Sequence, residues 1–301
     1  LIELRIGESV HRDSYALWAV SLADATKGQR VEKGKLELEC SCGQDCGGWC
    51  RITRRARGEE RARILRYLER DVEALWEYLT ERLPTWQQQL ALDGRGTMGG
   101  TAWHSAKVEC SLPDADPSMS RHRWTRPSYY TGRVETMRSS NGATLHYDMS
   151  AAYASMLHSL PLPMGEPARL GPMGAARALA AERAGVYEVT VRSPDQWLPV
   201  LPWRSPKGRV AYAVGELRGR WTWPELAHAL RCGYEVKAVH AAQVYGRTGT
   251  PVRSWVERMW EARQADPGPR QGYVKAAMAA LTGAFGARPY VSRLVVQPKR
   301  I

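Results

Sequence analysis

The segment 147–156 constrains the possible fold and chemistry of this chain more than any other ten residues do. An extended run over 143–147 ends at an acidic residue, Asp148, and the small residues that follow can begin a helix. A carboxylate at a strand end can hold a divalent metal near a triphosphate, and the ring of Tyr153, five positions on, can close over a sugar. Many strands end in aspartate, so an ordinary strand end is the alternative.

A second segment, 275–286, predicts a helix that runs into a glycine turn. Its alanines and Met278 favour helix, and we expect Gly283 and Gly286 to end it. Residues 255–263 predict another helix, and Pro-Gly-Pro at 267–269 breaks the chain between the two. The sequence therefore predicts a helical hairpin.

Three basic residues lie along this hairpin, namely Arg258, Arg263 and Lys275. Any one of them can belong to a solvated basic face, which is the common role of a surface cation. Together they can also neutralise a triphosphate, as a phosphate clamp opposite Asp148.

At these residues the chain resembles the family B DNA polymerases, most closely the protein-primed branch from phages and linear plasmids. Residues 148–155 are similar to the first polymerase motif of that family, Asp-x-x-Ser-Leu-Tyr-Pro-Ser. The second motif, Lys-x-x-x-Asn-Ser-Leu-Tyr-Gly, is met by Lys275, Leu281 and Gly283. Residues 162–167 resemble the Leu-Pro-x-Gly-Glu-Pro that follows the first motif in this branch, and Arg258 and Arg263 fall where the branch has basic residues on its fingers.

The resemblance implies a role for each matched residue. Asp148 binds metal, Tyr153 senses the sugar, Arg258, Arg263 and Lys275 contact the triphosphate, and Gly283 allows close backbone approach. The chain departs from both motifs: alanine stands at 151, 152 and 154 in place of Ser, Leu and Pro, and Ala279 and Thr282 replace Asn and Tyr. These departures put the placement of the templating base in doubt.

An upstream helix carries a second pair of candidate residues. Apolar residues at spacings of three and four over 65–79 predict a helix from Tyr67 to Leu83, and Tyr67 and Asp71 share one of its faces. A phenol and a carboxylate on that face can bind a metal and align its water. The pair resembles the third motif, Tyr-x-x-x-Asp, of the 3′–5′ exonuclease attached to these polymerases, and an ordinary amphipathic helix is the alternative.

Between these sites, residues 129–135 resemble the Tyr-x-Gly-Gly motif that joins the two activities in this family. Tyr129, Gly132 and Arg133 would grip single-stranded DNA by stacking and phosphate contact. A plain surface turn fits the same residues.

The resemblance implies an α+β fold, with the C-terminal part of an RNase H-like exonuclease domain followed by a polymerase palm with helical fingers. We expect the exonuclease part over 1–98, a linker rich in Gly, Ser, Pro and Asp over 99–128, and an incomplete palm and fingers over 129–301. Further local patterns predict helices at 11–22 and 223–230 and strands at 186–191, 209–214 and 236–245.

Composition agrees with a nucleic-acid partner. The chain has 43 Lys and Arg against 31 Asp and Glu, a formal charge of +12, which favours a polyanion through counterion release. No apolar run approaches the length of a membrane span and no signal peptide is visible. We therefore expect no membrane contact and, with the resemblance, a place in the cytoplasm of a cell that hosts a phage or mobile element.

Four cysteines, Cys40, Cys42, Cys46 and Cys50, lie within eleven residues of a glycine-rich loop. Four thiolates can close a tetrahedral structural zinc site, although this spacing is not one of the common finger patterns. Free thiols remain open, and so do disulfides, which an intracellular setting disfavours.

The resemblance also implies a function, and it implies that some motifs of the family lie outside this sequence. The family's first two exonuclease motifs are expected before Leu1, and the last palm motif, Tyr-x-Asp-Thr-Asp, after Ile301. We expect a DNA-directed DNA polymerase with 3′–5′ proofreading that uses Mg²⁺ or Mn²⁺, DNA template-primer, deoxynucleoside triphosphates and a terminal priming protein. Because two-metal phosphoryl transfer needs carboxylates from both palm motifs, we expect this stretch alone to be inactive. The alternatives are a non-catalytic DNA-binding remnant and a chain that is only an exonuclease.

Overall fold

The structure, a computed structural model, describes residues 3–6, 9–12, 21–34, 58–112, 123–130, 132–135, 142, 145–205 and 208–286. The chain divides into two compact units. The first, here the helical unit, comprises Leu1–Leu112, Ala151–His158 and Val252–Phe285. The second, here the sheet unit, comprises Pro113–Ser150, Ser159–Pro251 and Gly286–Ile301.

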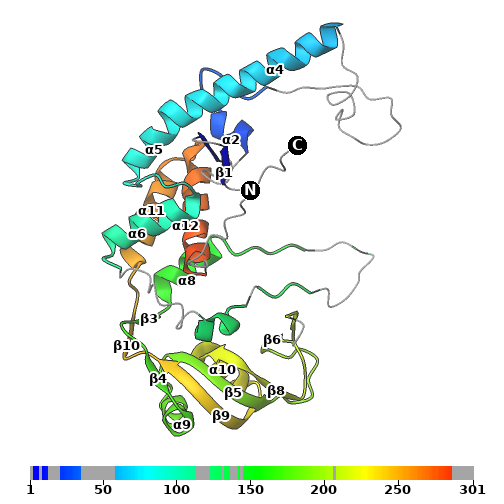
Figure 1. Ribbon diagram of the computed structural model, residues 1–301, viewed down its shortest axis with the longest axis vertical. Coiled ribbons are helices and arrows are strands. Elements are labelled where there is room, and N and C mark those ends of the chain that lie inside the picture. Colours follow the sequence, from blue (N-terminus) through cyan, green and yellow to red (C-terminus); the bar gives the residue numbers. More distant parts are fainter. Residues whose placement is uncertain are drawn as a thin grey trace. The chain divides into compact units, whose positions relative to one another are not determined.

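The helical unit contains one β-hairpin and a set of helices (Figure 1). The elements are β1 (Glu3–Ile6), β2 (Ser9–Arg12), α2 (Leu22–Thr26), α4 (Gly58–Glu77), the π-helical turn η1 (Tyr78–Arg82), α5 (Leu83–Gln89), α6 (Met98–Glu109), α8 (Ala152–Ser159), α11 (Arg253–Ala265) and α12 (Arg270–Phe285).

Two expectations about local structure in the first 130 residues are wrong. Residues 9–12 form β2, which pairs antiparallel with β1, whereas the sequence predicted a helix beginning at 11. Helix α2 instead begins at Leu22, after Ser21, whose hydroxyl accepts a hydrogen bond from the amide of Asp24 (3.1 Å). Residues 99–109 of the predicted linker belong to helix α6, which begins at Met98 and is capped by the Thr97 side chain.

The helix predicted from 67 to 83 is confirmed and is longer, because α4, η1 and α5 follow one another without a break. The π-turn precedes Pro84, which has no amide hydrogen to bond the carbonyl four residues earlier. A wider turn relieves that defect without ending the helix, and Leu83 donates instead to the carbonyl of Tyr78.

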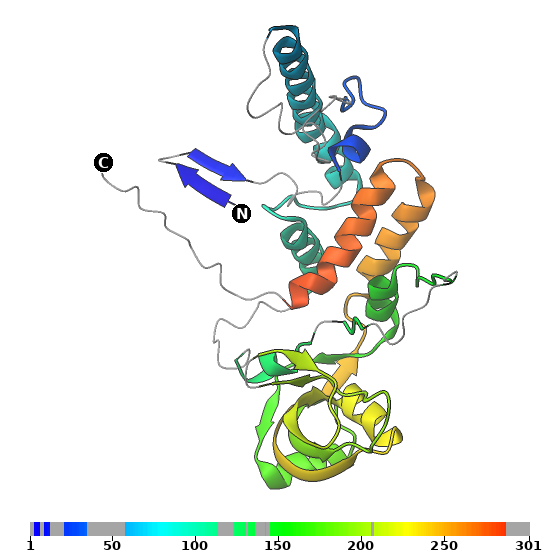
Figure 2. The ribbon, with the colours of Figure 1, turned by 90° about the vertical axis from the view of Figure 1, so that its right-hand side faces the viewer.

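Aromatic rings fill the core where α5 meets α12. The ring of Trp86 lies 5.7 Å from that of Tyr78 and 5.9 Å from that of Tyr273, centroid to centroid. The buried indole of Trp255 on α11 donates to the hydroxyl of Ser105 on α6 (3.0 Å). Figure 2 shows α11 and α12 side by side, so the predicted helical hairpin is confirmed. Gly283 lies inside α12 and does not end it; the helix ends at Phe285.

The sheet unit is built on a four-stranded antiparallel sheet in the order β4-β9-β5-β8. Its elements are the 3-10 turn η2 (Arg126–Ser128), β3 (Leu162–Met164), β4 (Ala168–Leu170), α9 (Pro172–Ala180), β5 (Gly185–Arg192), β6 (Trp203–Arg204), β7 (Val210–Ala211), β8 (Glu216–Thr222), α10 (Trp223–Arg231), β9 (Glu235–Val244) and β10 (Arg247–Gly249). The predictions over 186–191, 223–230 and 236–245 are confirmed, whereas only Val210 and Ala211 of 209–214 are strand.

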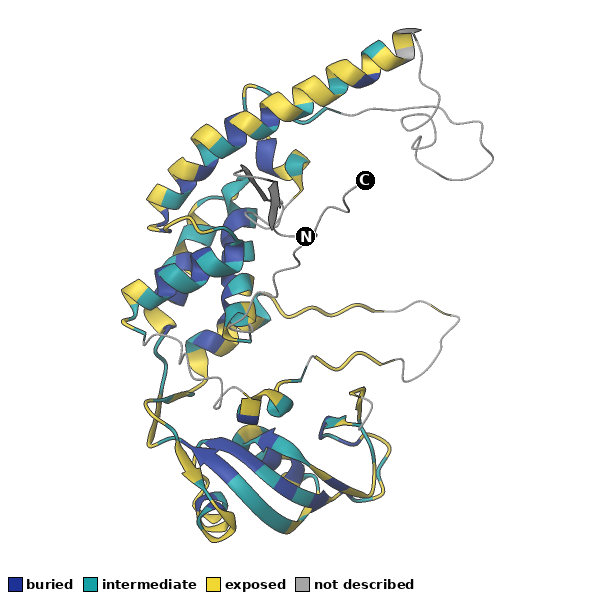
Figure 3. Ribbon diagram, viewed as in Figure 1, coloured by how far each residue is buried: buried dark blue, intermediate teal, exposed yellow. Residues whose placement is uncertain are grey.

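The two faces of this sheet differ. Tyr187, Val189 and Val191 alternate along β5 and are fully buried (Figure 3). They share one core with Ala175 of α9 and Leu226 of α10, so both helices cover the same face. The intervening residues of β5 point to the opposite face, which carries polar side chains.

We expect Gly185→Ala to destabilise the sheet unit by about 1–3 kcal/mol, as overpacking does. A Cβ at Gly185 would lie 2.9 Å from the Cα of Val244 and closer still to the carbonyl oxygen of Gln243, both on the neighbouring strand backbone. Gly246→Ala is the matched control, because its Cβ would meet no heavy atom within 4 Å. Urea unfolding of both variants measures the difference, and equal midpoints would contradict the expected clash.

Candidate functional site

Tyr67 and Asp71 lie on one face of α4, four residues apart, and both contact Lys33. The Lys33 ammonium donates to the Tyr67 hydroxyl (2.6 Å) and lies 3.5 Å from a carboxylate oxygen of Asp71. The hydrogen bond with Tyr67 is the main reason why the pKa of Lys33 is raised, with a further contribution from Asp71, against the opposing effect of burial. Lys33 is the residue that the sequence did not single out, because it lies 34 positions from its partner.

The segment that carries Lys33 is tied to the long helix by directed bonds. The Glu77 carboxylate accepts from the backbone amides of Arg30 (3.0 Å) and Val31 (3.2 Å). Arg82 donates to two backbone carbonyls of residues 25–27, at 3.0 and 2.7 Å. These bonds hold the ammonium over Tyr67 and Asp71, so the three groups form one preorganised cluster.

A cluster of this composition can take part in binding a phosphate. An ammonium beside a phenol and a carboxylate can neutralise a phosphate and orient a water. Asp71 fits a metal ligand poorly, because its carboxylate is engaged by Lys33 and lies 3.4 Å from the amide of Gly34. Within the described ranges, no three His, Cys, Asp or Glu side chains gather as ligands of one ion.

The three basic residues of the hairpin have different surroundings. The Arg258 guanidinium donates to Glu109 of α6 (2.6 and 2.9 Å) and to the carbonyl of Leu90, so it joins three parts of the helical unit. Arg263 stacks on Trp260, 5.2 Å from the ring centroid. Lys275 is exposed, and its ammonium has no ion pair or hydrogen bond with the residues that the structure describes.

Lys275 stands at one end of an exposed strip of α12. Ala279 and Gly283 follow it at intervals of four and are exposed as well, while Ala277, Met278 and Leu281 are buried on the opposite side. A Cβ at Gly283 would meet no heavy atom within 4 Å. The exposed residues that match the second motif therefore form a surface without bulky side chains, on which Lys275 supplies the positive charge.

Tyr153 lies on α8, which is fastened to the hairpin. Nε2 of His158 lies 2.9 Å from a carboxylate oxygen of Glu257, and Arg253 donates to the carbonyl of His158 (3.0 Å). Ala154 is buried, whereas Tyr153 is 63% exposed. The helix that carries Tyr153 is therefore bonded directly to the hairpin within the helical unit.

Asp148 belongs to the sheet unit and is exposed. Its carboxylate makes no ion pair with any described residue, so it is free to act as one ligand among several of a divalent metal. Its predicted place opposite the hairpin stays a prediction, because the hairpin belongs to the other unit.

Tyr129 and Arg133 also lie in the sheet unit. Arg126 stacks on the Tyr129 ring at 4.8 Å, and Arg204 donates to the Tyr129 carbonyl (3.0 Å). Arg133 stacks on Tyr212 at 4.0 Å and donates to the carbonyl of a proline, and around Gly132 a Cβ would meet nothing within 4 Å. Tyr129 is 47% exposed, which leaves part of its ring accessible.

The cysteine loop with Cys40, Cys42, Cys46 and Cys50 lies outside the described residues. Among the helices that are described, none has the length and apolar character needed to cross a membrane.

These features define a class of protein. The described residues contain a long helix with a Tyr-x-x-x-Asp face, a helical hairpin with an exposed strip that begins at Lys275, and an antiparallel sheet, and this set of elements matches the fold of a DNA polymerase. Solved structures of Phi29 DNA polymerase share it: the complex with primer-template DNA and incoming nucleotide has 14% identity and a TM-score of 0.61, over 91% of this chain and 48% of the other.

An orthorhombic crystal form of Phi29 DNA polymerase has 15% identity and a TM-score of 0.63, over 95% of this chain and 51% of the other. A complex of Phi29 DNA polymerase with single-stranded DNA has 15% identity and a TM-score of 0.61, over 93% of this chain and 48% of the other. The family model for DNA polymerase type B, organellar and viral, matches residues 58–299, and the chain belongs to this family. Among curated proteins no sequence matches significantly. The chain spans about half the length of the Phi29 structures.

We expect Tyr67→Phe to lower the pKa of Lys33, since the hydroxyl that accepts its hydrogen bond is removed. In the wild type this raised pKa stabilises the fold below the ordinary value of 10.5, and the stabilisation is lost as pH rises through the folded value. NMR titration of the lysine Cε resonance measures the change. Tyr153→Phe is the control, and an unchanged Lys33 pKa in Tyr67→Phe would rule out the hydrogen bond as its cause.

Proposed function

We propose that the chain is the part of a DNA-directed DNA polymerase that receives the incoming deoxynucleoside triphosphate, with a proofreading 3′–5′ exonuclease on the same protein. The observation that carries this is the exposed strip of α12: Lys275 is free of protein partners among the described residues, and the two positions that follow it on the same face are small. Membership of the type B family supports the reaction class.

In this proposal the residues of the helical unit position the nucleotide. Lys275 neutralises the triphosphate, and Ala279 and Gly283 let the nucleotide approach the helix closely. Tyr153 stacks under the sugar and rejects a 2′-hydroxyl. A divalent metal, Mg²⁺ or Mn²⁺, supplies charge neutralisation at the phosphates when bound, and Asp148 would be one of its ligands.

The assignment of the three basic residues is revised by their contacts. The guanidinium of Arg258 donates to Glu109 and to the Leu90 carbonyl, so we assign it the structural role of holding the hairpin in place. Lys275 carries the charge that meets the substrate. Arg263, stacked on Trp260, keeps its charge near the same end of the hairpin.

The cluster of Lys33, Tyr67 and Asp71 is proposed as part of the proofreading site. Its ammonium binds the phosphate of a single-stranded 3′ end, and Tyr67 and Asp71 orient that phosphate and a water. Partners under this proposal are template-primer DNA, held in part by Tyr129, Gly132 and Arg133, and a terminal priming protein. The setting is the cytoplasm of a host cell of a phage or mobile element.

A non-catalytic DNA-binding remnant is the second candidate. Ala279 and Thr282 stand where the family motif has Asn and Tyr, and the structural use of Arg258 removes one cation from the clamp. A complete protein that binds template-primer but adds no nucleotide would favour this candidate over the polymerase.

We expect Lys275→Ala in the complete polymerase to raise the nucleotide KM by about 10–100-fold, the loss of one charge-assisted contact. DNA affinity should change little, and stability should be unaltered because the side chain is exposed. Steady-state kinetics with varied nucleotide measure KM. Lys237→Ala, which removes the same charge from the sheet unit, is the control; an unaltered KM in Lys275→Ala would remove this residue from the site.

We expect Tyr153→Val in the complete polymerase to admit ribonucleotides, because the ring that crowds the 2′-hydroxyl is lost. Primer extension with mixed ribo- and deoxynucleotides measures the ratio of incorporation. Lys237→Ala, in the sheet unit, should leave this ratio unchanged. Equal sugar selectivity of wild type and Tyr153→Val would end the assignment of Tyr153 to the sugar.

A further inference from the structure

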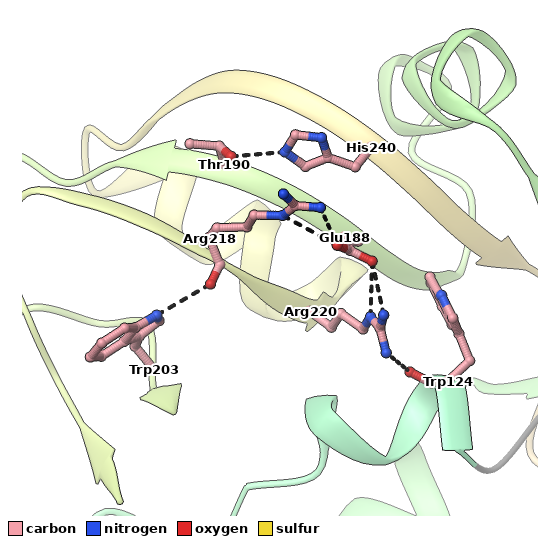
Figure 4. A network of polar contacts seen from close by, with 7 residues as sticks. All are labelled: Trp124, Glu188, Thr190, Trp203, Arg218, Arg220 and His240. Atoms are coloured by element: carbon pink, nitrogen blue, oxygen red, sulfur yellow. Dashed lines mark hydrogen bonds and ion pairs between the residues drawn. The ribbon is translucent and has the colours of Figure 1, made fainter. Parts of the chain in front are cut away.

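The polar face of the sheet in the sheet unit carries a buried indole, that of Trp124. Helices α9 and α10 pack on the opposite face, with the buried residues of β5. Trp124, just ahead of η2, is only 6% exposed and lies against the polar face, where η2 contacts β8 (Figure 4).

Two arginines from the sheet hold this indole. The guanidinium of Arg220 lies 4.8 Å and that of Arg169 5.6 Å from the Trp124 ring. Arg220 also donates to the Trp124 carbonyl (2.9 Å) and to a carboxylate oxygen of Glu188 (3.0 and 3.1 Å). Ring and backbone of Trp124 are therefore fixed by the same side chain.

Glu188 sets the direction of Arg220. Its other oxygen accepts from Arg218 (2.8 and 3.3 Å), so the carboxylate is held between two guanidinium groups (Figure 4). Burial would raise the pKa of Glu188, but the hydrogen bonds from Arg218 and Arg220 lower it below its ordinary value. The carboxylate stays ionised at neutral pH, and the network keeps its geometry.

The fixed tryptophan stands five residues ahead of Tyr129. At the other end of this short segment, Arg204 donates to the Tyr129 carbonyl and stacks on Tyr130 at 5.3 Å. The segment is thus fastened at both ends, and the half-exposed Tyr129 ring is presented in one orientation.

We propose that Arg220 and Glu188 are positioning residues, which act through Trp124 to present the Tyr129 ring as a stacking platform for single-stranded DNA. This rests on the proposed function of Tyr129. Neither the Arg220 guanidinium nor the Glu188 carboxylate needs to touch the DNA, because Nε, Nη1 and Nη2 of Arg220 already donate to Glu188 or Trp124.

The test compares Arg220→Gln with Arg218→Gln in the full chain, since both arginines bind Glu188, both substitutions remove one charge, and only Arg220 contacts Trp124. The probe is a fluorescein-labelled oligothymidine, and anisotropy measures its affinity across a salt series. Arg220→Gln should bind about tenfold more weakly, the loss of one stacked base, with an unchanged slope against salt. Arg218→Gln should bind as the wild type does.

A double-mutant cycle with Tyr129→Ala completes the test, because Arg220→Gln should have no further effect once the ring is gone. Wild-type affinity of Arg220→Gln, or a slope reduced by about 0.7 as for a direct phosphate contact, would overturn the inference. If Tyr129→Ala itself binds like the wild type, the proposed DNA contact fails, and the inference fails with it. If Arg220→Gln does not fold, the isosteric variant Glu188→Gln takes its place, and the same loss of affinity for the oligothymidine is expected.

Discussion

The rotation of α12 about its own axis decides which of its residues can meet a ligand. Tyr273 fixes that rotation, because its ring packs on Trp86 and its hydroxyl accepts a hydrogen bond from Gln87 (3.2 Å). An aromatic ring with a satisfied polar tip tolerates little displacement in a buried site. With Tyr273 inward, Lys275 lies about 200° further round the helix and faces outward, and the exposed strip that begins at Lys275 follows from the packing of the core.

Much of this arrangement could be predicted from local sequence. The alanine-rich run and the Pro-Gly-Pro break suffice for the hairpin, and alternation suffices for β5 and β9. The failures have physical causes. Helix α6 has two glycines in its first turn and looks like a linker, yet Met98, Ala102 and Ala106 are buried, and tertiary packing overrides a weak propensity.

The functional state of a side chain was harder to predict than its secondary structure. Arg258 and Lys275 look alike in sequence, as cations on predicted helices. What separates them is Glu109, which lies 149 residues before Arg258 and occupies its guanidinium. Lys33 and Arg220 were missed for the same reason: their partners are 32 to 96 residues distant, and no periodicity in a window of twenty residues can bring such pairs together.

The charge of +12 also has a different meaning once the structure is known. Several arginines donate to backbone carbonyls of distant residues, among them Arg82, Arg133, Arg204, Arg220, Arg253 and Arg258. A guanidinium used in this way still contributes to the long-range field that attracts a polyanion, but it has fewer donors left for a contact with phosphate. These six arginines join segments of the fold, and under the proposed function the nucleotide and the DNA strand meet groups that are still accessible, such as the ammonium of Lys275 and the exposed rings of Tyr153 and Tyr129. Net charge then favours encounter with nucleic acid, while accessible groups of this kind would decide where on the protein it binds.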